Sequence, residues 1–203
     1  MRSPDPRWFP RFGDVPGVSY ATPANLDLSR LRHRHARPEV HRYPDMEPSL
    51  WWGDTSRAPA GDHVLDDPRS ATTGRVLRNL GEALELPGEP SDYHFAIQGV
   101  TDLLWSRRAA EPAVFAELER LCWADAQLID ACPDTIRYEH RDGGLQYFRV
   151  TTFERLLTLY LTEGALADAA RVLEVAERHG NGDTTSAGRV RDRWAAFAAE
   201  DAF

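Results

Sequence analysis

Apolar residues recur with helical spacing along most of the chain after residue 67. The strongest pattern places apolar side chains at positions i, i+3, i+4, i+7 and i+8 of one helix face, namely Phe153, Leu156, Leu157, Tyr160 and Leu161. A second face follows, namely Leu166, Ala169, Ala170, Leu173 and Ala176. Gly164 separates them, and we expect a tight turn there that leaves little room for a branched side chain. The pattern therefore predicts two short helices folded back on each other.

This stretch resembles a single tetratricopeptide repeat. That family places an aromatic residue, a leucine and a tyrosine on its first helix, a glycine at the turn, and small and bulky apolar residues on its second helix. The matching positions are Phe153, Leu156, Tyr160, Gly164, Ala169, Leu173 and Ala176. Asn181 stands where the family has a closing proline. The resemblance covers residues 150–181 and implies a TPR-like helical hairpin, for which an ordinary pair of packed helices is the alternative.

Four further segments with helical periodicity predict helices at residues 68–84, 91–108, 112–132 and 187–199. Proline suits a first turn, as at Pro68 and Pro112, and Pro133 ends the third of these helices. We expect each of these helices to bury an apolar face. The faces include Leu80 and Leu84 in residues 68–84; Ala96, Val100, Leu103 and Leu104 in residues 91–108; Phe115 and Leu118 in residues 112–132; and Val190, Trp194 and Phe197 in residues 187–199.

The segment before the two short helices has a different pattern. Apolar and polar residues alternate in residues 136–140 and 145–150, on either side of Asp142-Gly143-Gly144. Alternation around Asp-Gly is typical of a β-hairpin. We predict a short β-hairpin at residues 136–150, with a plain loop as the alternative. Thr151 and Glu154 fit a capping box at the start of the helix that follows.

The first 67 residues lack helical periodicity. Twelve of the 14 prolines lie within residues 1–90, and those before residue 24 would break any helix. The segment nevertheless carries aromatic residues that disordered chains usually lack, namely Trp8, Phe9, Phe12, Tyr20, Trp51 and Trp52. We expect an irregular Pro-rich arm, residues 1–67, that packs on a helical domain, residues 68–203, with one short helix at Asn25–Arg37. The predicted fold class is mainly α, either TPR-like or a small α bundle.

The composition and the absence of known motifs exclude several classes of function. All 24 basic residues are arginine, which excludes Schiff-base, P-loop and kinase chemistry that needs lysine. No run of 18 apolar residues and no secretory signal pattern occurs, so we expect a cytoplasmic protein without a membrane span. His33, His35, His41 and Asp45 lie close in sequence but match no metal motif. We therefore predict no catalytic residue, no cofactor and no metal ion.

Charge is unevenly distributed. Residues 1–90 carry 12 Arg and 13 Asp or Glu, a net charge of −1, whereas residues 91–203 carry 12 and 19, a net charge of −7. The basic stretch, residues 30–42, has five arginines and three histidines against one glutamate. We interpret it as a contact surface whose candidate partner-binding residues are Arg32, Arg34, Arg37, Trp51 and Trp52. The basic stretch could dock on the acidic residues 91–203, bind another protein, or bind nucleic acid. Nucleic-acid binding is disfavoured because residues 91–203 would repel phosphate groups.

These observations favour a protein-interaction or adaptor module that presents a helical groove to another protein, because Trp, Tyr and Arg are common interface anchors. An enzyme whose site is assembled from distant residues is the alternative, with His94, Glu139, His140 and Asp142 as candidates. Nucleic-acid binding through residues 30–42 is a third reading.

Overall fold

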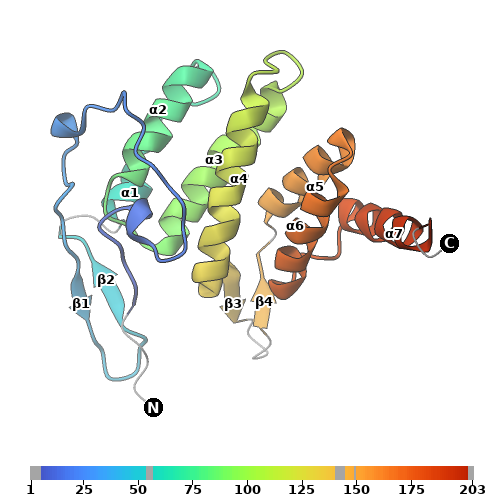
Figure 1. Cartoon of the computed structure of the whole chain (residues 1–203). Coiled ribbons are helices and arrows are strands. Elements are labelled where there is room, and N and C mark those ends of the chain that lie inside the picture. Colours follow the sequence, from blue (N-terminus) through green and yellow to red (C-terminus); the bar gives the residue numbers. More distant parts are fainter. Residues whose placement is uncertain (1–5, 54–56, 140–144, 149, 201–203) are drawn as a thin grey trace. The chain divides into compact units, whose positions relative to one another are not determined.

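The computed structural model describes residues 6–53, 57–139, 145–148 and 150–200, and it is mainly helical, as the apolar spacing predicts (Figure 1). The chain forms two compact units, Met1–Leu103 and Leu104–Phe203. The boundary between these units falls inside helix α3 (Pro90–Arg107). The division into an arm and a helical domain at residue 67 stays a prediction. None of the described helices is both long enough and apolar enough to cross a membrane.

The first unit is built on helices α2 (Thr73–Leu84) and α3, with a short helix α1 (Pro59–Asp62) before them. Helix α2 begins where the hydroxyl of its N-cap Thr72 accepts a hydrogen bond from the amide of Arg75. It buries the predicted apolar face. Of the predicted face of α3, Leu104 is fully buried, whereas Ala96, Val100 and Leu103 are only partly buried. The other fully buried side chains of α3 are Tyr93, His94, Ile97 and Thr101. The Tyr93 hydroxyl donates to Leu86 O at 2.8 Å, so its ring is buried with a hydrogen-bonded hydroxyl.

The segment before these helices packs on them. A 3-10 helix, η1 (Phe12–Asp14), buries Phe12 completely, and its ring contacts Tyr20 and Tyr93 with centroids 5.4 Å away in each case. Phe9 and Gly88 exchange two backbone hydrogen bonds. The Thr22 hydroxyl donates to the buried Glu85 at 2.6 Å. Aromatic side chains and backbone hydrogen bonds thus order a proline-rich segment that has no helical periodicity of its own.

The expected helix at Asn25–Arg37 is wrong. Only a 3-10 turn, η2 (Leu28–Arg30), forms there, because the Asp27 carboxylate accepts from the amide and hydroxyl of Ser29 and competes with the helical pattern. Two strands that the sequence did not predict follow, β1 (Glu39–His41) and β2 (Ser49–Trp51). They pair antiparallel, with Val40 opposite Leu50. This β1–β2 ribbon extends past the end of α2 (Figure 1).

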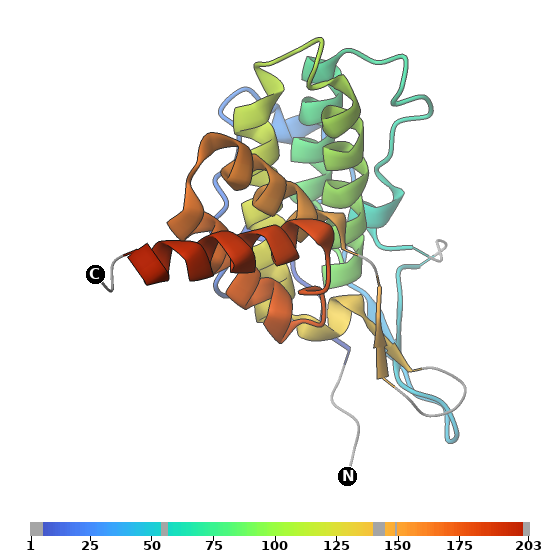
Figure 2. The ribbon, with the colours of Figure 1, turned by 90° about the vertical axis from the view of Figure 1, so that its right-hand side faces the viewer.

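The second unit contains α4 (Val114–Ala131), the 3-10 helix η3 (Pro133–Ile136), β3 (Arg137–Glu139), β4 (Leu145–Tyr147), α5 (Thr151–Glu163), α6 (Leu166–Arg178) and α7 (Thr185–Glu200). The predicted β-hairpin strands are confirmed, because β3 and β4 pair antiparallel with Tyr138 opposite Gln146. The Asp-Gly-Gly sequence between them lies outside the described residues. Helix α7 lies across α5 and α6 and contacts both (Figure 2).

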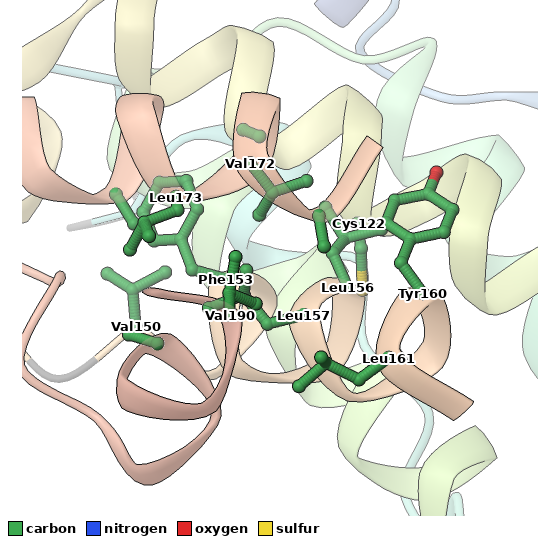
Figure 3. Close-up of a cluster of buried hydrophobic side chains, with 14 of the residues drawn as sticks. Cys122, Val150, Phe153, Leu156, Leu157, Tyr160, Leu161, Val172, Leu173 and Val190 are labelled. Carbon is green, nitrogen blue, oxygen red and sulfur yellow. The ribbon is translucent and has the colours of Figure 1, made fainter. Parts of the chain in front are cut away.

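The two predicted apolar faces meet in the core of this unit. Figure 3 shows side chains of α5 and α6 packed together with Cys122 of α4 and Val190 of α7. The predicted burial is confirmed for Phe153, Leu156, Tyr160, Val172 and Leu173. The residues that carry the tetratricopeptide resemblance thus belong to two packed helices and their connection. Membership of that repeat family stays a prediction, because an ordinary helix pair buries the same positions.

Two details of this unit differ from expectation. Gly164 adopts φ +77°, the left-handed C-cap conformation, but a Cβ there would meet nothing within 4 Å, so backbone conformation rather than crowding requires glycine. The inward orientation predicted for Trp194 and Phe197 is wrong, because 43% and 51% of their surfaces are exposed. Their rings contact each other at 6.1 Å on the outer half of α7, where every described side chain is exposed. Phe115, also predicted inward, is exposed.

Candidate functional site

The basic stretch runs from η2 through a turn into strand β1. The turn closes with a hydrogen bond from Ala36 N to His33 O at 2.9 Å, and His33 has a left-handed backbone with φ +64°. Arg32 and Arg37 are exposed, and Arg34 is partly buried. Within the described residues of the first unit, none of the three forms an ion pair, although Arg30 pairs with Asp27 at 2.8 Å. Their predicted pairing with carboxylates of residues 91–203 or of a partner stays a prediction.

The β1–β2 ribbon brings one predicted tryptophan next to this stretch. Trp51 of β2 lies opposite Glu39 of β1 in the antiparallel register. The His41 ring stacks on the Trp51 ring, with centroids 4.9 Å apart and planes 15° apart. Apolar and aromatic side chains are exposed along the ribbon and its connection, namely Val40, Tyr43, Met46 and Trp51. We call these side chains, together with Arg32, Arg34 and Arg37, the ribbon surface.

Trp52 has a different role. Its ring packs edge-on against Trp8, with centroids 5.8 Å apart, and it is partly buried. It therefore holds the N-terminal segment near the base of the ribbon. Of the five predicted partner-binding residues, four belong to the ribbon surface and Trp52 acts as an internal anchor.

A small cavity of about 290 Å³ lies beside the same stretch. Its lining includes Arg30, Arg32 and His33 as well as Asp62 and His63. His63 Nε2 lies 3.0 Å from Glu82 Oε2, so this imidazole already has a carboxylate partner. The cavity mixes both signs of charge, and its volume is at the lower limit for a small-molecule site.

A larger cavity of about 710 Å³ lies in the second unit, and we call it the α5 pocket. Its wall on α5 is a polar stripe at positions i, i+3, i+4 and i+7, namely Thr151, Glu154, Arg155 and Thr158. The end of α3, the segment before α5 and the α6–α7 connection supply the rest, namely Trp105, Phe148, Val150, Gly180, Asn181, Asp183, Thr184 and Thr185. The sequence reading missed this stripe because it followed only the apolar positions of the same helix.

Hydrogen bonds fix the carboxylate of Glu154 in this pocket. Ser186 Oγ donates to Glu154 Oε1 at 2.6 Å, and Thr158 Oγ1 lies 3.0 Å from the same serine oxygen. The other carboxylate oxygen, Oε2, is buried and accepts no hydrogen bond from any described residue. The predicted capping box is wrong, because the N-cap is Val150, which has no side-chain cap, and Glu154 reaches α7 instead. The amide of Val150 donates to Asn181 Oδ1 at 3.2 Å.

The cationic side of the pocket is organised around an indole ring. Arg155 is a charged residue with only 7% of its surface exposed, and its guanidinium carbon lies 6.0 Å from the Trp105 ring centroid. Arg108 lies closer to that ring, at 4.1 Å, and also donates a hydrogen bond to Trp105 O. Arginine over an indole ring is a favourable cation–π arrangement. The pocket therefore presents a guanidinium and a carboxylate from adjacent residues of one helix.

The candidate catalytic residues do not form a site that the structure describes. His94 is fully buried in the first unit, Glu139 lies in β3, and His140 and Asp142 lie outside the described residues. Among the residues whose positions are described, no group of three or more His, Cys, Asp or Glu could hold a metal ion. The enzyme reading stays a prediction. No protein-family model, curated protein or solved structure matches this chain.

Proposed function

We propose that this chain is a protein-interaction module, with an adaptor role, that binds an acidic segment of a partner protein through the ribbon surface. The observation that carries the proposal is the combination of exposed aromatic and apolar side chains with arginines that have no ion-pair partner in the described part of the first unit. Interface centres are enriched in Trp, Tyr, Met and Arg, and the ribbon surface contains all four types.

The apolar component supports contact with a protein. Met46 is 70% exposed and Trp51 is 49% exposed, on a ribbon of only two strands. Large apolar side chains that gather on one exposed element mark interaction sites more often than scattered ones do. The stacked His41 ring holds the Trp51 ring in place, which lowers the conformational entropy that a partner must remove on binding.

The charged component favours an acidic partner segment. Residues 30–42 carry five arginines and one glutamate, a net charge of about +4 with the histidines neutral. Carboxylates of a partner would pair with Arg32 and Arg37, which face solvent. A nucleic acid would meet the same arginines, but the chain as a whole carries a net charge of −8, which repels a polyanion.

Selection from a displayed library of random peptides tests this proposal. We expect selected sequences to combine Asp or Glu with aliphatic or aromatic residues, and to be retained by the wild-type chain but not by Trp51→Ala. Truncation of a central interface tryptophan typically costs about 2 kcal/mol or more, which is roughly 30-fold in affinity.

The matched control is Trp194→Ala, which removes a tryptophan of similar exposure from α7. If the selected peptides bind Trp51→Ala and wild type equally and are lost in Trp194→Ala, the contact surface lies on α7 and the proposal is wrong. If selection yields basic peptides, the charge argument fails.

A further inference from the structure

The outer edge of β1 pairs with no other strand in the part of the chain that the structure describes. The sheet that contains β1 has two strands, β1 and β2. Outside the ribbon itself, no described hydrogen bond involves the backbone of Glu39, Val40 or His41. An edge strand presents the backbone N–H and C=O groups of alternate residues, and these groups can pair with a further strand. The ribbon therefore offers a backbone edge for contact in addition to its side chains.

The two edges of the ribbon differ in their surroundings. Trp52 follows β2 directly, and its ring packs on Trp8 with centroids 5.8 Å apart, so the N-terminal segment contacts the chain just after β2. Charge also distinguishes the edges, because Arg37 and Arg42 flank β1, whereas Glu47 lies just before β2. An acidic segment is attracted to the first edge and repelled near the second.

We propose that the acidic segment of the partner binds in an extended conformation, as a third strand along the outer edge of β1. This inference rests on the proposed function, because it takes the ribbon surface as the site that binds an acidic segment. In such a complex, main-chain hydrogen bonds provide affinity and side chains of the ribbon provide selectivity. An isolated ribbon of two strands is marginally stable, so a third strand also stabilises the ribbon.

The register of the ribbon places its side chains on two faces that the added strand would extend. Residues directly opposite each other share a face, so Glu39, His41 and Trp51 lie on one face, and Val40 and Leu50 lie on the other. The second face suits apolar side chains. On the first face, Glu39 Oε2 lies 3.5 Å from His41 Nε2, and this carboxylate disfavours an acidic residue beside it. We therefore expect the segment to be neutral or apolar where it pairs with β1.

The acidic residues of the segment belong at its two ends. Arg37 and Arg42 lie beyond the two ends of β1. A segment with a short neutral core that pairs with β1 brings its flanking carboxylates to the level of both arginines. A second copy of this chain would bring the same arginines to the edge and would be repelled. The length of β1, three residues after Pro38, further limits pairing between copies.

N-methylation of single amides in a probe peptide tests this inference on the full chain. The probe is a short capped peptide with a valine–threonine–valine core between pairs of glutamates, and titration calorimetry measures its Kd. An N-methyl group removes one donor and blocks pairing at that amide. We expect N-methylation at alternate residues of the core to weaken binding by at least about tenfold, and N-methylation at the residues between them to leave Kd unchanged, because alternate amides of a strand point to the same neighbour.

Amide hydrogen exchange, followed by NMR, identifies the strand that receives the probe. A saturating concentration of the probe should slow exchange at the amides of β1 that face away from β2, because they become hydrogen-bonded. The amides of β2 that face away from β1 are the matched control, since they belong to the same ribbon but to its other edge. Their exchange should not change.

The outcomes separate this inference from the proposed function. If the probe binds but N-methylation has no alternating effect, or if the outer amides of β2 become protected instead, the segment does not add a strand to β1 and only this inference is wrong. The same holds if the probe does not bind at millimolar concentration while peptides selected from the library do. If neither the probe nor any library peptide binds, both proposals are wrong.

Discussion

At the scale of single residues, side chains of α5 form the core of the second unit together with side chains of α4, α6 and α7. Leu156 is fully buried between α5 and its neighbours. We expect Leu156→Ala to lower the free energy of unfolding by about 2–5 kcal/mol, because the substitution removes buried apolar surface and leaves a cavity. Chemical denaturation measures the change. Phe197→Ala, at an exposed position of α7, should change it by about 0.5 kcal/mol, and an equal effect of both substitutions would contradict the assigned core.

Tyr160 gives the unit a stability that depends on pH. Its hydroxyl accepts from Trp123 Nε1 and donates to Glu119 Oε1, both at 2.6 Å. Burial raises the pKa of Tyr160 to about 12, and the hydrogen bond to Glu119 adds to the rise. The unfolded chain, with a pKa of about 10, loses this proton first. The stabilisation is therefore complete below about pH 10 and is lost as pH rises toward 12.

The variant Tyr160→Phe isolates this effect, because the other tyrosines titrate in both proteins. We expect the difference in free energy of unfolding between wild type and Tyr160→Phe to be about 1 kcal/mol smaller at pH 11 than at pH 8. Urea denaturation at the two pH values measures it. A difference that does not depend on pH would mean that Tyr160 is not a buried hydrogen-bond donor.

At the scale of elements, the α5–α6 connection depends on one backbone conformation. Gly164 has φ +77°, which costs a residue with a Cβ about 1–2 kcal/mol. We expect Gly164→Ala to destabilise the chain by about that amount. Gly188 lies inside α7, and a Cβ there would also meet nothing within 4 Å, so Gly188→Ala should stabilise it by about 0.5–1 kcal/mol. Thermal denaturation compares the two, and the same sign for both would contradict the assigned conformations.

The sequence predicts elements well where one strong periodicity decides them. The apolar faces around Leu156 and Leu173 and the alternation in residues 136–150 were readable because each follows a single period. Strands β1 and β2 were not, because no Asn-Gly or Asp-Gly sequence marks their connection, whereas Asp142-Gly143-Gly144 marks the connection of the predicted hairpin. The buried face of α3 was predicted only at Leu104, because the other fully buried positions include the polar residues His94 and Thr101.

The candidate site residues were predictable only where they stand out within one short stretch of sequence. The basic stretch and Trp51 stand out in the sequence because charge and tryptophan are conspicuous there. The α5 pocket combines the polar stripe of α5 with residues more than 20 positions away in the chain, such as Trp105 and Asp183. No local pattern connects these segments, so only the folded structure identifies the pocket.

At the scale of the whole molecule, the central claim is that an acidic protein segment binds the ribbon surface. Fluorescence anisotropy with two labelled probes tests it directly: a short peptide of alternating glutamate and leucine, and a single-stranded oligonucleotide of equal charge. The test variant replaces Arg32, Arg34 and Arg37 by glutamine. The control replaces three exposed arginines outside the ribbon surface by glutamine, namely Arg75, Arg78 and Arg189.

We expect the peptide to bind wild type and the control with equal Kd. The test variant should bind it about 3-fold to 160-fold more weakly, because each of three exposed ion pairs contributes about 0.2–1 kcal/mol. The oligonucleotide should bind all three proteins more weakly than the peptide binds wild type. The claim would be contradicted if the oligonucleotide bound wild type more tightly than the peptide does and if only the test variant lost this binding. The ribbon surface would then be a nucleic-acid contact.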